Sequence, residues 1–313
     1  MYIDYVPESQ KTVLPKTAVR PSILLAVGEN PQNHFGAKFL ASFFSNNKNV
    51  KISLLHILPP EKIEHRGPYG MTIQGGRMDD ELYSKHATAA KKALTSVHDL
   101  LLDAGLDEDN ISIEARSQKG TTAEDIFSAS VAGNHSALLL GKRGRSWLED
   151  VFAGIPNITQ EIITASCGMP IWTAFGHEHS NNNILLCVDG SRSSHNIAKH
   201  VGKTLAHSHG HSITMLRVLR KNTATQKTAD QIFKECSTIL QDEGIREDRL
   251  NYKVLINENI PQAIITEANN GQYAVVAAGR SGAGNSFVRN LLIGSVSLQL
   301  WQKLDKNCFW MTC

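Results

Sequence analysis

Short apolar runs alternate along this chain with longer stretches in which hydrophobic positions recur with a helical period of about 3.6 residues. The apolar runs are rich in Ile, Leu and Val, and their alternation with helical stretches is typical of βαβ units. The first half of the chain repeats the order of the second. In the second half the pattern predicts strands at 183–188, 212–219, 250–256, 273–279 and 307–312, and helices at 193–207, 226–243, 260–270 and 295–304.

The two halves also repeat each other residue by residue. Residues 23–28, Ile-Leu-Leu-Ala-Val-Gly, recur as Ile-Leu-Leu-Cys-Val-Asp at 184–189, and residues 52–58 match 213–219 at the same offset. A chain of 313 residues is also about twice the usual length of one domain. The repeat therefore predicts two domains of one architecture.

Continuous apolar strands indicate a parallel sheet that is covered on both faces, and right-handed crossovers favour a doubly wound topology. We predict the α/β class, with two flavodoxin-like doubly wound domains, each a five-stranded parallel sheet flanked by helices. The polar segment between Phe175 and Asn183 separates domain 1–175 from domain 183–313. Trp172 and Trp310 fall in the last strand of each half, where packing in the core or between the domains is their ordinary use.

The first half carries an insertion of about 22 residues, which the alignment places at 59–80. Its glycines at 67, 70, 75 and 76 disfavour regular structure. Irregular loops of this length are either functional or disordered, and this one follows the second strand at the edge where ligands bind. A disordered segment, a lid and a segment that docks a partner are the hypotheses.

Composition excludes several classes of protein. The chain is 41% hydrophobic and 20% charged, as in ordinary globular proteins, and its net charge of +2 is spread over both halves, so no nucleic-acid surface is expected. No run of 18 apolar residues and no export signal is visible, so we predict no membrane span and a cytoplasmic location. The five cysteines form no C-x-x-C pair and are interpreted as reduced thiols.

The stretch 278–296 carries the most chemical information, because it runs from a predicted strand end through a glycine-rich loop into a predicted helix. Glycines allow the backbone to approach a ligand closely. Gly294 and Ser295 open the helix and offer N–H groups, the positive end of the helix dipole and a hydroxyl. This combination suits a phosphate group.

This order, G-x-x-G, a spacer and G-[S/T] after the fourth strand, resembles the nucleotide loop of the universal stress protein family. Three further features fit the family: the repeated domain plan, Asp189 after the first strand of the second half, and L-x-V after the second strand of that half. The likeness covers residues 20–313. It implies binding of ATP or AMP, with or without Mg²⁺, in some members and no ligand in others. Position by position, the resemblance implies that Asp189 contacts the ribose and that Cys187 and Val218 border the adenine. It implies that the phosphate loop is lined by Ala278, Gly279, Ser281 and Gly282. It also implies that phosphate oxygens are held by Gly294, Ser295 and Val296.

The two halves depart from the family pattern in different ways. In the second, eleven residues separate Gly282 from Gly294, whereas nucleotide-binding members have nine. In the first the spacing is nine, but Ile155 and Pro156 follow the glycine, and Gly28 stands where the second half has Asp189. Ile has no hydroxyl and Pro has no amide hydrogen, so the first site is degenerate and nucleotide is expected mainly in the second domain.

Three other motifs have competing interpretations. Gly202-Lys-Thr resembles the end of a Walker loop, but it falls inside a predicted helix and lacks the preceding glycine, so no P-loop is predicted. The segment His-Ser-His-Gly-His at 207–211 is either a metal clamp or a solvated turn. Ser191 lacks the G-x-S-x-G context of a nucleophile and is predicted to cap the following helix.

Three functions remain open from the sequence. The leading one is a nucleotide-responsive stress regulator that presents a surface to an unknown protein partner, without catalysis. The second is a slow ATPase, for which Asp189 is the one obvious candidate group. The third is a ligand-free scaffold. In the family the last strand commonly pairs domains, so strands 169–174 and 307–312 predict an intramolecular pseudo-dimer, with a homodimer of the whole chain as the alternative.

Overall fold

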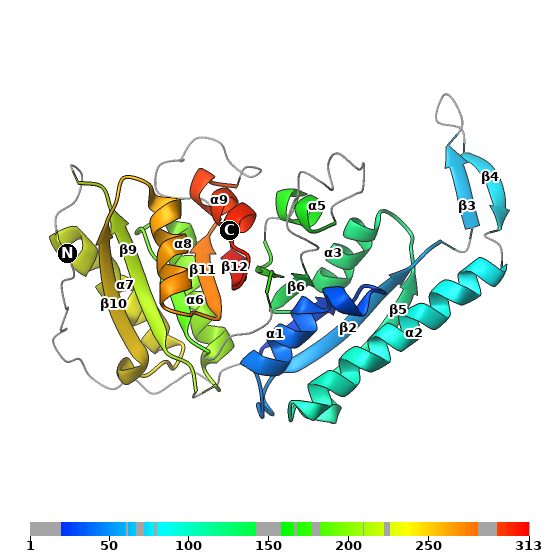
Figure 1. Ribbon diagram of the computed structural model, residues 1–313, viewed down its shortest axis with the longest axis horizontal. Coiled ribbons are helices and arrows are strands. Elements are labelled where there is room, and N and C mark those ends of the chain that lie inside the picture. The colour runs from blue at the N-terminus through cyan, green and yellow to red at the C-terminus, as the bar shows by residue number, and fades with distance from the viewer. Residues whose placement is uncertain are drawn as a thin grey trace.

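The computed structural model describes residues 20–60, 62–66, 72–77, 80–141, 158–165, 168–176, 182–208, 210–221, 226–280 and 293–312. The predicted fold class is confirmed, because each half is a parallel sheet flanked by helices. Every strand and helix predicted for the second half is present, and no end differs from the prediction by more than two residues. Figure 1 shows the two halves side by side.

The first half contributes five parallel strands and the helices that cover them. The strands are β1 (Ser22–Ala26), β2 (Lys51–Leu58), β5 (Ile111–Ser117), β6 (Ala137–Gly141) and β7 (Ile171–Ala174). The helices are α1 (Phe35–Phe43), α2 (Asp80–Asp103), α3 (Thr122–Ala132) and α5 (Ile158–Ala165).

The second half repeats this plan. Its strands are β8 (Ile184–Cys187), β9 (Ile213–Leu219), β10 (Leu250–Ile256), β11 (Val275–Gly279) and β12 (Cys308–Thr312). Its helices are α6 (Arg192–Leu205), α7 (Gln226–Asp242), α8 (Ile260–Asn270) and α9 (Ser295–Lys303). Gly202 lies within α6, so the Walker-like triplet is helical, as predicted.

The strand order explains where a ligand can bind. The ten strands form one sheet in the order β10-β9-β8-β11-β12-β7-β6-β1-β2-β5. Within each half the chain moves outward from the first strand, then returns to the first strand's other side. The winding therefore reverses beside β1 in the first half and beside β8 in the second, and the carboxyl ends of the strands at these two points are the expected binding sites.

Apolar side chains alternate between the two faces of the sheet. In β1, Ile23 and Leu25 belong to one buried cluster and Leu24 to the other. The first cluster includes apolar side chains of α1, α2, α6 and α7, and the second includes those of α3, α5, α8 and α9. A parallel sheet with both faces covered by helices is the arrangement that the near-continuous apolar strands predict.

The insertion at 59–80 differs from the expectation of irregular structure. Strands β3 (Lys62–Arg66) and β4 (Thr72–Arg77) pair antiparallel as a separate two-stranded sheet between β2 and α2. Figure 1 shows this ribbon projecting beyond the carboxyl end of β2. The glycines did not prevent strand formation, because Gly75 and Gly76 lie within β4.

The two halves join through their last strands, as predicted. Strand β7 pairs antiparallel with β12, and Trp172 lies opposite Trp310 in this pairing. Both indoles are fully buried, with ring centroids 4.0 Å apart and ring planes within 5° of parallel. This pairing turns two five-stranded sheets into one and makes the chain an intramolecular pseudo-dimer.

Two further expectations concern thiols and membranes. Cys187, Cys236 and Cys308 are free thiols, in line with the interpretation of reduced cysteines, while Cys167 and Cys313 lie outside the described residues. Among the helices that the structure describes, none is both long and apolar enough to cross a membrane.

Candidate functional site

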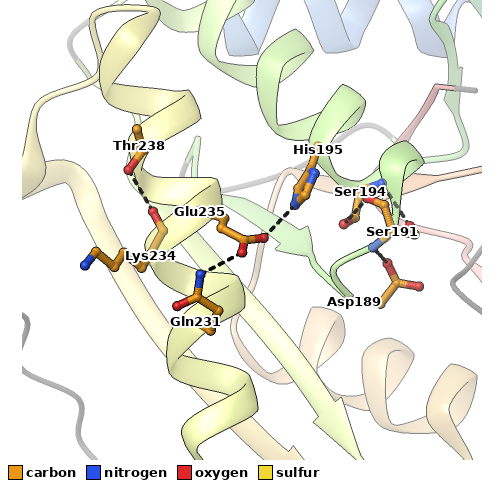
Figure 2. Close-up of polar contacts among 8 residues, drawn as sticks. All are labelled: Asp189, Ser191, Ser194, His195, Gln231, Lys234, Glu235 and Thr238. Carbon is orange, nitrogen blue, oxygen red and sulfur yellow. Dashed lines mark hydrogen bonds and ion pairs between the residues drawn. The ribbon is translucent and has the colours of Figure 1, made fainter.

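The second-domain site forms where β8 ends and α6 begins. The backbone N–H of Ser191 donates to Asp189 Oδ1 at 2.9 Å, which orients the carboxylate, and Ser191 Oγ accepts from the N–H of Ser194 at 3.1 Å. Ser191 therefore caps α6, as predicted. Figure 2 shows Asp189 and Ser191 together at this helix start.

Helix α6 is held against α7 by a second group of contacts in Figure 2. His195 Nε2 lies 3.3 Å from Glu235 Oε2, and Gln231 donates to the other oxygen of Glu235 at 2.7 Å. His195 thus points to the carboxylate of α7 and away from Ser191 (Figure 2). This arrangement favours capping over nucleophilic chemistry for Ser191.

Strand register brings most of the predicted site residues to one edge. Cys187 lies opposite Leu216, and the N–H of Val188 donates to the Leu216 carbonyl at 3.0 Å, so Asp189 follows at the level of Val218. On the other side β8 pairs with β11, which places Ala278 and Gly279 at the same carboxyl edge. Burial and the charge of Asp189 raise the pKa of the Cys187 thiol to about 12, so this thiol is neutral at pH 7.

Gly279 is required by close packing at this edge. A Cβ atom there would lie 2.7 Å from the backbone carbonyl carbon of Ser193. Its carbonyl accepts from Ser297 Oγ of α9 at 2.6 Å, which ties the end of β11 to the first turns of that helix. Gly279, which was predicted to line the phosphate loop, therefore has a packing role.

Helix α9 begins at Ser295, and its first two residues are the predicted phosphate contacts Ser295 and Val296. Gly294 precedes them, but its N–H donates to the Arg280 carbonyl at 2.7 Å. This amide is therefore paired within the protein, and the assignment of Gly294 as a phosphate contact stays a prediction. Ser281 and Gly282 lie outside the described residues.

Arg217 is a site residue that the sequence reasoning missed. It lies in β9, donates to the Val188 carbonyl at 3.4 Å and is close enough to Asp189 for their charges to interact. Burial lowers the pKa of its guanidinium, and the carboxylate of Asp189 opposes that shift. A charged residue in an otherwise apolar strand was the available signal, and the repeat places His56 at the same position of the first half.

The first-domain site retains a carboxylate that the sequence comparison did not find. Gly28 has no side chain, but the next residue, Glu29, lines a cavity at the carboxyl edge of β1, β2 and β6. Gly141 ends β6 there, and Thr159 Oγ1 donates to its carbonyl at 3.4 Å, as Ser297 does to Gly279. Ile155 and Pro156 lie outside the described residues.

One histidine of the segment 207–211 is packed inside the protein. His211 is buried and its Nε2 donates to the Phe43 carbonyl at 2.9 Å, while His209 lies outside the described residues. In the part of the chain that the structure describes, no three His, Cys, Asp or Glu side chains are arranged to hold a metal ion.

The chain resembles known proteins in both sequence and fold. The model of the universal stress protein family matches residues 20–166 and again 180–309. No protein in the curated set is similar enough in sequence to match.

Solved structures are similar over nearly the whole chain. A universal stress protein from Archaeoglobus fulgidus DSM 4304 shares 16% identity over 93% of this chain and 95% of its own, with a TM-score of 0.63. A protein of unknown function from Pseudomonas aeruginosa PAO1 shares 14% identity over 94% and 92%, with a TM-score of 0.54. A universal stress protein from Archaeoglobus fulgidus in complex with dAMP covers 49% of this chain and 96% of its own, at 15% identity and a TM-score of 0.34. The first two likenesses show a shared tandem fold.

Proposed function

This chain belongs to the universal stress protein family and contains two of its domains in tandem, and from that premise we propose that it is a stress-response regulator that binds ATP or AMP mainly in its second domain. The observation that carries the proposal is the meeting of Asp189, Gly279 and the start of α9 at the point where the winding of the second sheet reverses. Ligands of doubly wound sheets bind at such points.

Each part of this edge suits one part of a nucleotide. The Asp189 carboxylate, oriented by the Ser191 amide, can accept hydrogen bonds from ribose hydroxyls. Val218 and Cys187, the latter with a neutral thiol, offer an uncharged surface to the adenine ring. The family resemblance assigns these roles, and the hydrogen bonds and registers described above support them.

The phosphate end of the ligand would lie against α9. The first amides of a helix have no acceptor within the helix, and its dipole makes that end positive. Ser295 adds a hydroxyl at the first helical position, and Arg217 adds positive charge across the same edge beside Asp189. Mg²⁺ would join an ATP complex through phosphate oxygens.

Isothermal titration of nucleotide-free protein with ATP and AMP tests the proposal. We expect one site of micromolar affinity that weakens about tenfold or more in Asp189→Asn and Ser295→Ala, because each loses a hydrogen bond to the ligand. Glu29→Gln is the matched control in the first domain and should leave this affinity unchanged. Absence of heat with either nucleotide would overturn the proposal and favour a scaffold, whereas phosphate release that is lost in Asp189→Ala would indicate an ATPase.

A further inference from the structure

Strand β5 forms the outer edge of the first half, at one end of the ten-stranded sheet. Its central residues 112–116 are all exposed, and Ile113 keeps 47% of its surface accessible. An exposed edge strand offers backbone N–H and C=O groups to another strand, and most proteins cover such an edge or blunt it. The edge at β5 is therefore a candidate interaction surface.

The opposite edge of the sheet, β10, is covered by helices of its own domain. Tyr252 packs its ring against Phe233 of α7, with centroids 5.5 Å apart. On the other face Lys253 Nζ lies 2.6 Å from Glu267 Oε2 of α8. Both faces of β10 are thus in contact with a helix, although this strand also ends the sheet.

The repeat shows why β5 is not covered in the same way. Ala129 of α3 stands at the position of Glu267 and carries no charge. Glu114, which matches Lys253, pairs within its own strand, where Arg116 Nη2 donates to Glu114 Oε2 at 2.8 Å. The side chains of Arg116 and Glu114 remain 46% and 50% exposed. This ion pair therefore lies open on the surface of the edge strand.

The backbone groups of β5 alternate between β2 and the outer side. The N–H of Gln118 donates to the Leu58 carbonyl at 2.9 Å, so even-numbered residues direct their N–H and C=O toward β2. Ile113 and Ala115 have odd numbers and direct theirs away from the sheet. A further strand would pair with β5 through these residues.

The charges on β5 are complementary to a second copy of the same strand. If two β5 strands pair antiparallel with Ala115 at the centre, Glu114 of each copy lies opposite Arg116 of the other. Opposite charges that face each other across two strands stabilise the pairing, and like charges destabilise it. With Glu114 at the centre, two carboxylates would face each other, so the charges select the register centred on Ala115.

Helix α2 fits this arrangement as well. It packs against both β2 and β5, so its axis lies over the space between these strands. With strands about 4.8 Å apart, the α2 axes of two copies would be roughly 10 Å apart, close to the 8–10 Å at which helices pack. Ile113 lies opposite Leu54, whose side chain belongs to the buried cluster on the α2 side of the sheet. Ile113 would therefore be buried between the two copies.

From these observations we propose that the chain forms a homodimer in which the two β5 strands pair antiparallel about a two-fold axis centred on Ala115. The same patch of each copy then contacts the other, as two-fold symmetry requires. The pairing of β7 with β12 stays within each chain, and one sheet continues through both copies. This interface lies apart from the nucleotide site proposed for the second domain.

Sedimentation velocity of the full chain across the micromolar range tests the proposal through its charges. We expect a species with twice the mass of one chain. Glu114→Arg or Arg116→Glu alone should weaken the dimer about tenfold or more, because like charges then face each other. The double variant with both substitutions restores alternating charge and should recover the dimer.

A matched pair of substitutions compares the two edges of the sheet. Ile113 of β5 and Ile256 of β10 are exposed to a similar degree, 47% and 53%. Ile113→Lys should abolish the dimer, because it places a charge in the interface, whereas Ile256→Lys should leave it unchanged. Thermal unfolding of both variants checks that the fold is retained.

Cross-linking reads the register directly. In the proposed pairing the two Ala115 Cα atoms lie about 5.5 Å apart, within the range of a disulfide. Ala115→Cys treated with oxidised glutathione should therefore give a covalent dimer on a non-reducing gel. Ser112→Cys is the control, because its two copies would lie about 20 Å apart along the strands. The unmodified chain, treated in parallel, accounts for the native thiols.

Three results would overturn the proposal. The first is a single-chain mass at every concentration. The second is a dimer that neither Ile113→Lys nor the single charge reversals weaken, since another surface would then form it. The third is a cross-link in Ser112→Cys that is as strong as the one in Ala115→Cys.

Discussion

Trp172 and Trp310 stack face to face at the junction of the two domains, and no part of either indole reaches solvent. They lie opposite each other in the antiparallel pairing of β7 with β12. Phe39 and Phe43 of α1 pack their rings against this pair, with Phe43 5.6 Å from Trp310 between centroids. The junction is therefore a hydrophobic core shared by the two domains rather than a loose contact.

Replacing either tryptophan should destabilise the whole chain. For Trp172→Ala or Trp310→Ala we expect a loss of about 3–5 kcal/mol in the free energy of unfolding, because a large buried side chain leaves a cavity. The stacking of the two rings adds about 0.5–1.5 kcal/mol to the loss. Chemical denaturation followed by far-UV circular dichroism measures the change.

The matched control is Val131→Ala, since Val131 is 55% exposed on α3 and should change stability by less than about 0.5 kcal/mol. An unchanged denaturation midpoint in both tryptophan variants would show that the β7–β12 pairing does not join the domains.

Strand and helix positions could be predicted because the signal is local. In β11 and α8 the apolar period and the flanking polar residues lie within the element itself, so the predicted ends fall within two residues of the observed ones. The ribbon β3–β4 was missed because its glycines were taken as a sign of irregular structure, whereas Gly75 and Gly76 lie within β4. Burial of Trp172 and Trp310 in the core or between the domains could be predicted because both fall in the last strand of their half, but their stacking against each other is a finding of the structure.

The hydrogen bond between Glu29 and His86 in the first domain could not be predicted from the sequence, for a physical reason. Gly28 aligns with Asp189 and has no side chain. The carboxylate of the first domain instead belongs to the next residue, Glu29, whose longer side chain reaches the same edge of the sheet. His86 comes from α2, 57 positions away from Glu29 in sequence, and only the fold brings these two side chains within 2.8 Å. Hydrogen bonds between distant elements leave no periodic signal.

Gly279→Ala should affect both stability and nucleotide binding. The new Cβ would lie 2.7 Å from the Ser193 backbone, so β11 or α6 must move, at a cost of about 1–3 kcal/mol. The same movement would displace the edge that carries Asp189, and ATP affinity should fall with stability. Thermal unfolding and titration measure the two effects.

Gly28→Ala is the control for this substitution, since it lies at the matched edge of the first domain. A Cβ there meets no atom within 4 Å, and Gly28 is not among the glycines with positive φ. We expect no loss of stability, or a gain of up to about 1 kcal/mol from the stiffer unfolded chain. Equal losses in both variants would contradict the packing role of Gly279.

Stability should fall as the pH drops from 7 to 5, because two buried histidines stay neutral in the folded chain. Burial and nearby Lys203 lower the pKa of His200 to about 3, and its Nε2 accepts from Trp172 Nε1 at 2.9 Å. Burial is the main cause that lowers the pKa of His211 to about 4. At pH 7 both rings are neutral in the folded chain and mostly neutral in the unfolded chain.

Below pH 6.5 the unfolded chain, whose histidines have an ordinary pKa near 6.5, binds protons that the folded chain does not, so the free energy of unfolding decreases. Protonation of each ring in the unfolded chain lowers the free energy of unfolding by about 2 kcal/mol between pH 7 and pH 5, since 1.36 kcal/mol corresponds to one pKa unit.

Two variants test this assignment. His200→Gln keeps an acceptor for Trp172, and His211→Gln keeps a donor for the Phe43 carbonyl, but neither side chain can titrate. Denaturant midpoints at pH 7, 6 and 5 should therefore show a shallower decline in each variant than in the unmodified chain, and identical declines in all three would refute the assignment. The window stops at pH 5 because carboxylates begin to titrate below it and would add a decline of their own.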